Sequence, residues 1–189
     1  MLFQILSFLI EVAVTLVGGA CLLRLYMRWR RLPMGNPVGR FVQALSDWLV
    51  LPLRHIVPAG DRMDVASLLA AWLLKLLQYA ALMGLLGIAR WSILPLLALL
   101  GVARLTASVA TAVIIVAAVL SWTGNRTPVS DVFEHLAAPL LAPIRKLIPP
   151  VGGVDLSPLL LVVVLQVLAM VLGSLQGSLL GAGSMALFG

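Results

Sequence analysis

A chain of 189 residues, 62% of them hydrophobic and only 11% charged, has too little polar surface to fold as an ordinary soluble domain. Its mean hydropathy is +1.12. These values indicate an integral membrane protein with a single membrane domain over residues 1–189. The net charge of +6 fits the basic cytoplasmic loops of such a protein, so we expect no nucleic-acid partner.

Four segments approach or reach the roughly 20 apolar residues that a transmembrane helix needs. They are residues 1–23, residues 65–89, a stretch within 92–121, and residues 157–180. The basic residues gather between them: Arg24, Arg28, Arg30, Arg31, Arg40, Arg54 and Arg62 in the first long loop, Arg126, Arg145 and Lys146 in the second, and Arg90 alone on the other side. The positive-inside rule then predicts cytoplasmic loops and both termini outside the cytoplasm.

The two long loops repeat each other. Residues 37–64 match residues 128–155 without a gap, at an offset of 91 (128 − 37 = 91). The shared motif is a proline, an arginine two positions later, a second proline and then an aspartate: Pro52, Arg54, Pro58 and Asp64 in the first copy, Pro143, Arg145, Pro149 and Asp155 in the second. We therefore predict an all-α fold of four spans in two tandem parallel repeats, residues 1–90 and 91–189, each a helix, an amphipathic cytoplasmic loop and a helix.

Each loop has the pattern of a short helix at the membrane surface. Asn36 and Thr127 each precede a proline, which predicts a capping residue followed by proline at the first helical position. Apolar residues then recur at helical spacing, and Pro52 and Pro143 are expected to end the two helices. Asp64 and Asp155 come just before spans, where a carboxylate caps a helix; a binding loop made by the two aspartates is the functional alternative.

The motifs resemble those of the YggT family, small bacterial membrane proteins with plastid relatives. The resemblance covers nearly the whole chain and is most specific at Asn36-Pro37, at residues 52–58 and at residues 143–158. It implies an inner-membrane protein without an agreed biochemical activity. Relatives are tied to cell division and nucleoid distribution, to cofactor assembly on a plastid membrane cytochrome complex, and to osmotic tolerance and cation uptake.

Four polar residues fall at similar depth within the predicted spans: Glu11, Lys75, Arg104 and Gln166. Charged residues inside a membrane cost about 2.5–3.5 kcal/mol each even on insertion scales, so they usually face the bundle and pair. We expect Glu11 to pair with Arg104 or Lys75. The group is interpreted as a structural network that fixes helix packing, with an ion or proton pathway as the functional alternative.

Gly173, Gly177 and Gly181 recur at four-residue spacing in the last span, which lets helix backbones approach closely. The stripe predicts packing within the bundle or formation of a homo-oligomer. Enzyme motifs are missing from the sequence, and His55 and His135 are not equivalent in the repeat, so we expect no catalytic, cofactor-binding or metal site.

The function favoured by these patterns is a non-enzymatic membrane scaffold or assembly factor, and the resemblance implies that it acts in cell division, in the envelope or on a membrane complex. Its two cytoplasmic amphipathic helices would bind an unidentified membrane or cytoplasmic protein, with the lipid bilayer as the other partner. The alternative is a small transporter or channel subunit that affects cation uptake and osmotic tolerance, built on the four polar residues within the spans.

Overall fold

The computed structural model describes residues 1–57, 64–87, 91–123, 127–147 and 155–185, and they are helical with short connections. The helices are α1 (Leu2–Trp29), α2 (Pro37–Ile56), α3 (Val65–Leu86), the short 3-10 helix η1 (Trp91–Ile93), α4 (Leu94–Thr123), α5 (Pro128–Leu147) and α6 (Ser157–Met185). These residues include no strand, so the all-α prediction is confirmed for the described part of the chain.

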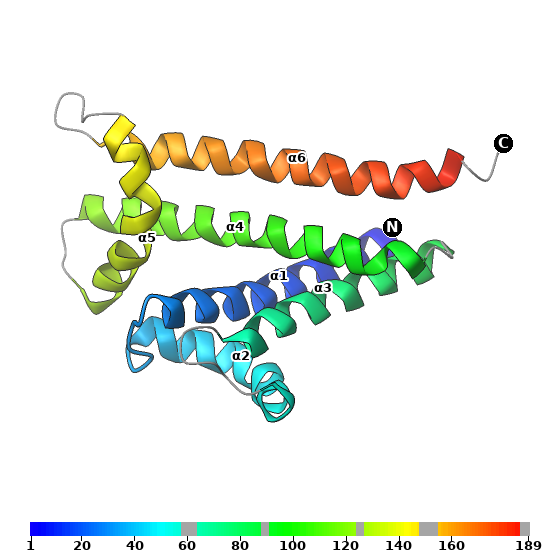
Figure 1. Ribbon diagram of the computed structural model, residues 1–189, viewed down its shortest axis with the longest axis horizontal. Coiled ribbons are helices and arrows are strands. Elements are labelled where there is room, and N and C mark those ends of the chain that lie inside the picture. Colours follow the sequence, from blue (N-terminus) through cyan, green and yellow to red (C-terminus); the bar gives the residue numbers. More distant parts are fainter. Residues whose placement is uncertain (58–63, 88–90, 124–126, 148–154, 186–189) are drawn as a thin grey trace.

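Among the described residues, four helices are long and apolar enough to cross a membrane, as predicted: they cover Gln4–Trp29, Val65–Leu85, Trp91–Thr123 and Ser157–Gly181. The N-terminus and the far end of α6 lie at one end of the molecule, and α2 and α5 lie at the other (Figure 1). The predicted first span is too short, because the helix continues beyond residue 23 to Trp29. Arg24 and Arg28 therefore belong to α1, not to the following loop.

Apolar clusters between the helices hold them together. One joins Met27 of α1 and Val42 of α2 to Ile114 of α4 and Leu136 of α5. Another packs Cys21, Leu22, Val50, Val102 and Leu105 around Ala66, Ala70 and Ala71, whose small side chains let α3 approach its neighbours closely. The hydroxyl of Tyr26 also donates to the carbonyl of Leu136 at 2.7 Å, which ties α1 to α5.

The predicted caps of α2 and α5 are confirmed. The side-chain oxygen of Asn36 accepts a hydrogen bond from the backbone N–H of Gly39 at 2.6 Å, directly before Pro37. The hydroxyl of Thr127 accepts one from the N–H of Ser130 at 3.1 Å, directly before Pro128. In each case a polar side chain satisfies an N–H that the first helical turn leaves without a backbone partner.

The prediction that Pro52 and Pro143 end these helices is wrong. Helix α2 continues through Pro52 to Ile56, and α5 continues through Pro139 and Pro143 to Leu147. Proline inside a helix costs about 3 kcal/mol because one backbone hydrogen bond is lost. In α2, buried Val50 and the ion pair of Arg54 with buried Asp64 offset this cost. In α5, the burial of Leu136 and Leu141 contributes more than the exposed ion pair of Arg145 with Asp155.

The two surface helices differ in what they expose. Helix α2 buries Val42, Ser46 and Val50 against the bundle, while the apolar rings of Phe41 and Trp48 remain exposed. The exposed residues of α5 are more polar and include Asp131, Glu134, His135 and Lys146. Helix α2 therefore offers an apolar surface to lipid, whereas α5 offers a largely polar surface.

Candidate functional site

The carboxylate of Asp64, between α2 and α3, has more ion-pair partners than any other side chain in the described structure. Its Oδ2 atom lies 2.5 Å from a terminal nitrogen of Arg54, 3.0 Å from Arg28 and 3.6 Å from Nε of Arg24. The Asp64 side chain is fully buried. Arg24 and Arg28 come from α1 and Arg54 from α2, so one buried acid joins three helices. We call Arg24, Arg28, Arg54 and Asp64 the Asp64 cluster.

A second carboxylate and a hydroxyl complete the surroundings of Arg24, which is only 3% exposed. Its Nη1 atom donates to Asp47 at 2.6 Å and to the hydroxyl of Ser46 at 2.9 Å, both on α2. Buried charges are tolerated only when they are paired and hydrogen-bonded. These contacts therefore fix the angle at which α2 leaves the ends of α1 and α3.

The arginines keep Asp64 ionised. Burial acts to raise the pKa of this carboxyl, but the hydrogen bonds from Arg54 and Arg28 outweigh it and hold the pKa below its ordinary value. A carboxylate with this pKa and three guanidinium partners is a poor general acid or base near neutral pH. The cluster is suited to holding helices together and unsuited to proton transfer.

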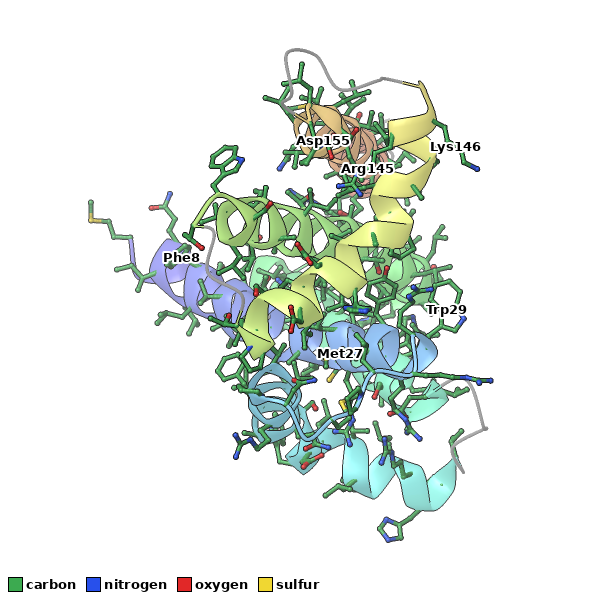
Figure 2. All side chains as sticks on the ribbon, turned by 90° about the vertical axis from the view of Figure 1, so that its left-hand side faces the viewer. Phe8, Met27, Trp29, Arg145, Lys146 and Asp155 are labelled. Atoms are coloured by element: carbon green, nitrogen blue, oxygen red, sulfur yellow. The ribbon has the colours of Figure 1, made fainter. Side chains whose placement is uncertain are left out.

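The equivalent pair in the second half of the chain is more open. Nε of Arg145 donates to Asp155 at 2.8 Å, and the two side chains are 53% and 38% exposed. Figure 2, which faces this end of the molecule, shows Arg145 directed towards Asp155 at the start of α6, and Lys146 directed away from the bundle. The contact with Ser157, followed by that with Arg145, holds the pKa of Asp155 below its ordinary value.

The capping prediction for the two aspartates is half correct. Oδ1 of Asp155 accepts a hydrogen bond from the N–H of Ser157 at 2.9 Å and so caps α6. The side chain of Asp64 makes no cap contact to α3; its backbone carbonyl accepts from Ser67 instead. The Asp64 carboxylate contacts the arginines instead of the free N–H groups at the start of α3. Of the motif residues, Pro52 and Pro143 are exposed within the last turns, and Pro58 and Pro149 lie outside the described residues.

Only one of the four predicted intramembrane polar residues is buried. Lys75 is 7% exposed, and its Nζ donates to Gln78 one turn along α3, at 2.9 Å. Glu11, Arg104 and Gln166 are exposed. Glu11 and Arg104 lie near enough to act on Lys75 electrostatically, but Glu11 forms no direct ion pair with any side chain in the described ranges. Its pairing with Arg104 or Lys75 stays a prediction.

A second set of polar residues lies beside Lys75, and sequence reasoning missed it. Gln176 of α6 is 5% exposed and donates to the hydroxyl of Tyr79 at 2.7 Å. Helices α3 and α4 lie close together here: a Cβ on Gly101 of α4 would lie 2.8 Å from the Tyr79 ring and 3.2 Å from the Lys75 side chain. Glycine at 101 therefore makes room for both side chains, and Gln176 ties α6 to α3.

The glycine stripe of α6 has mixed surroundings. A Cβ at Gly173 would lie 3.8 Å from the guanidinium carbon of Arg104, so this part of α6 lies against α4. A Cβ at Gly177 would meet no atom of the described residues within 4 Å. Packing within the bundle therefore involves Gly173, and the choice between bundle packing and a homo-oligomer stays open for Gly177 and Gly181.

Two signals in the sequence pointed to the missed residues. Arg24 and Arg28 are one turn apart, so they share a face of a helix that continues beyond residue 23. Gln78 is three positions after Lys75 and within reach of it for the same reason.

Within the described ranges, no three His, Cys, Asp or Glu side chains lie close enough together to hold a metal ion.

Four long apolar helices, packed side by side with charged clusters at one end, define a multi-pass helical membrane protein. The sequence pattern of the CCB3/YggT family matches residues 3–86 and 96–176, and the chain belongs to this family. It is 34% identical to the Escherichia coli K12 protein named "Uncharacterized protein YggT", over 87% of each chain. It is 31% identical to the Vibrio alginolyticus "Uncharacterized protein in proC 3'region", over 91% of this chain and 95% of that one. No solved structure matches it.

Proposed function

We propose that this protein is a non-enzymatic scaffold or assembly factor of the bacterial inner membrane, with α2 and α5 as its cytoplasmic platform and both termini outside. The observation that carries the proposal is the contrast between the two ends of the bundle. At the end with α2 and α5, ionic contacts hold two helices across the ends of the spans and leave polar side chains exposed. A rigid surface of this kind suits binding to another protein.

The basic side chains support the proposed orientation. Arg24, Arg28, Arg54 and Arg145 all lie at the end of the bundle that carries α2 and α5. Basic residues close to span ends favour the cytoplasmic side. The N-terminus lies at the opposite end of the molecule (Figure 1), so it would face away from the cytoplasm.

The tandem repeat is part of the same proposal. Helices α2 and α5 begin and end 91 residues apart, at Pro37 and Pro128 and at Ile56 and Leu147. Arg54 pairs with Asp64, and 91 residues later Arg145 pairs with Asp155. The two ranges that match the family, 3–86 and 96–176, are separated by the boundary between the predicted repeats, residues 1–90 and 91–189. These correspondences support two parallel copies of one unit, although the exposed surface of the second copy is more polar.

The lack of a reactive group in the Asp64 cluster supports a role without catalysis. All three arginines contact Oδ2 of the Asp64 carboxylate, its Oδ1 is buried away from solvent, and Lys75 is held by Gln78. A general base or nucleophile needs a free partner position for the substrate. Binding through the exposed residues of α5 needs no such group.

Photo-crosslinking in living cells tests the platform. A photoreactive amino acid at His135, which is exposed on α5, should give one dominant protein adduct, and the same group at exposed Trp91 at the other end should not. Asp131→Arg should reduce the His135 adduct at least fivefold, because it reverses a charge on the same exposed surface. Membrane insertion and thermal stability should not change.

Equal adducts at His135 and Trp91, or an adduct that Asp131→Arg leaves unaltered, would contradict the platform. Charge reversal at Arg54 is unsuitable for this test, because Arg54 contacts Asp64 at 2.5 Å and its loss would disturb the fold itself.

A further inference from the structure

The second half of the molecule contains an apolar groove where the first half has its charged cluster. The groove has a volume of about 950 Å³ and lies between α4, α5 and α6. Ile115, Val119, Ala137 and Ala138 line it, and each lies 91 positions after a member of the first set: Arg24, Arg28, Ser46 and Asp47. The arginines that fill the first half are thus replaced by aliphatic side chains, and the space they would occupy is empty of protein.

The rim of the groove carries charges of both signs. Arg145, Asp155 and Glu134 are among its lining residues. Arg145 uses Nε for Asp155, and within the described ranges its two terminal nitrogens, like the carboxylate of Glu134, have no hydrogen bond or ion pair. One guanidinium donor edge and one unpaired carboxylate therefore face the same opening.

The position of the groove indicates what can reach it. It lies at the end of α4 beside Trp122, which is 82% exposed, and exposed tryptophans of membrane proteins favour the headgroup level. The lining below the rim, including Leu159 and Val163, is aliphatic and continues into the surface of the spans. A lipid lying in the bilayer beside the groove would have its headgroup at the level of the charged rim and its acyl chains along the aliphatic lining.

We propose that this groove binds one zwitterionic phospholipid, with its phosphate on Arg145, its ammonium on Glu134 and an acyl chain between α4 and α6. The volume lies within the roughly 300–1,000 Å³ typical of ligand sites. A lipid with a net negative charge fits less well, because Glu134 and Asp155 together outnumber Arg145 at the rim. The binding of this lipid does not depend on the scaffold function, and either can be wrong alone.

Native mass spectrometry of the detergent-purified full chain tests the site, with phosphatidylethanolamine and phosphatidylglycerol added separately to delipidated protein. The wild type should retain one phosphatidylethanolamine at least tenfold more tightly than phosphatidylglycerol. Glu134→Gln should remove most of that preference, because it deletes the acceptor for the ammonium group.

Val119→Arg should abolish retention. It introduces the residue found 91 positions earlier, Arg28, which reaches Asp64 at 3.0 Å, so the new guanidinium is placed to reach Asp155 and fill the groove. Thr123→Arg is the matched control, since it adds the same charge at the same end of α4 outside the groove. Ala138→Leu fills the groove without adding charge and replaces Val119→Arg if that variant fails to fold.

Equal retention of both lipids, no retained lipid, or retention that both groove-filling variants leave unchanged would overturn the site. Co-purification of a protein that occupies the groove in place of lipid would also overturn it. Loss of the lipid together with an unchanged His135 crosslink would support the lipid site and leave the platform intact.

Discussion

Replacement of Asp64 by asparagine is expected to destabilise the folded protein by about 3–5 kcal/mol, the usual cost of removing one partner from a buried ion pair. The substitution leaves Arg24, Arg28 and Arg54 close together without the carboxylate that all three contact. Arg24 is almost completely buried, so water cannot replace the lost charge. The free energy of unfolding in detergent micelles measures the effect directly.

Asp155→Asn is the matched control for this prediction. Asp155 has one arginine partner and both side chains are partly exposed, so the lost ion pair should cost about 0–1 kcal/mol. Asparagine also keeps the cap on α6. If the two substitutions cost the same, the Asp64 cluster does not hold the three helices together in the way described.

Gly101→Leu is expected to destabilise the protein by about 1–3 kcal/mol through overpacking. Its Cβ alone would lie 2.8 Å from the Tyr79 ring and 3.1 Å from the Tyr79 hydroxyl, so the tyrosine must move away from α4. That movement breaks the hydrogen bond from Gln176, which ties α6 to α3. Thermal unfolding of the purified protein in detergent measures the loss.

A matched variant and a mutant cycle separate this cause from a general effect on helices. Gly84→Leu should change stability by no more than about 0.5 kcal/mol, because a Cβ there meets nothing within 4 Å. Tyr79→Ala should relieve part of the cost of Gly101→Leu, so the two changes should be non-additive. Strict additivity would show that Tyr79 is not the side chain displaced.

The general architecture can be predicted from local patterns in the sequence. Apolar length predicts the four spans, and the residue pairs Asn36-Pro37 and Thr127-Pro128 predict where α2 and α5 begin. These features are local, since a span depends on its own hydropathy and a cap on the next three residues. The ends of α2 and α5 are harder to predict, because contacts with other helices offset the cost of proline: the ion pair of Arg54 with Asp64 in α2, and the burial of Leu136 and Leu141 in α5.

The charged and polar sites depended on distant contacts, and their prediction was less complete. Asp64 lies just before a span, as predicted, but its partners Arg24 and Arg28 come from 36 or more residues away on a different helix. Gln176 and Tyr79 are 97 residues apart in the sequence, and their meeting depends on how α6 packs. The groove in the second half could not be predicted, because it is a space between three helices and the spacing of residues along the sequence does not indicate how far apart helices pack.

We propose that this chain acts through its cytoplasmic surface and does not conduct ions. Cation flux into liposomes that hold the purified protein, measured beside the Glu11→Gln variant, tests it most directly. We predict that folded, inserted protein gives no flux above that of empty liposomes, for either variant. Flux that falls when Glu11 is replaced would contradict the claim and would make Glu11, Lys75 and Arg104 an ion pathway.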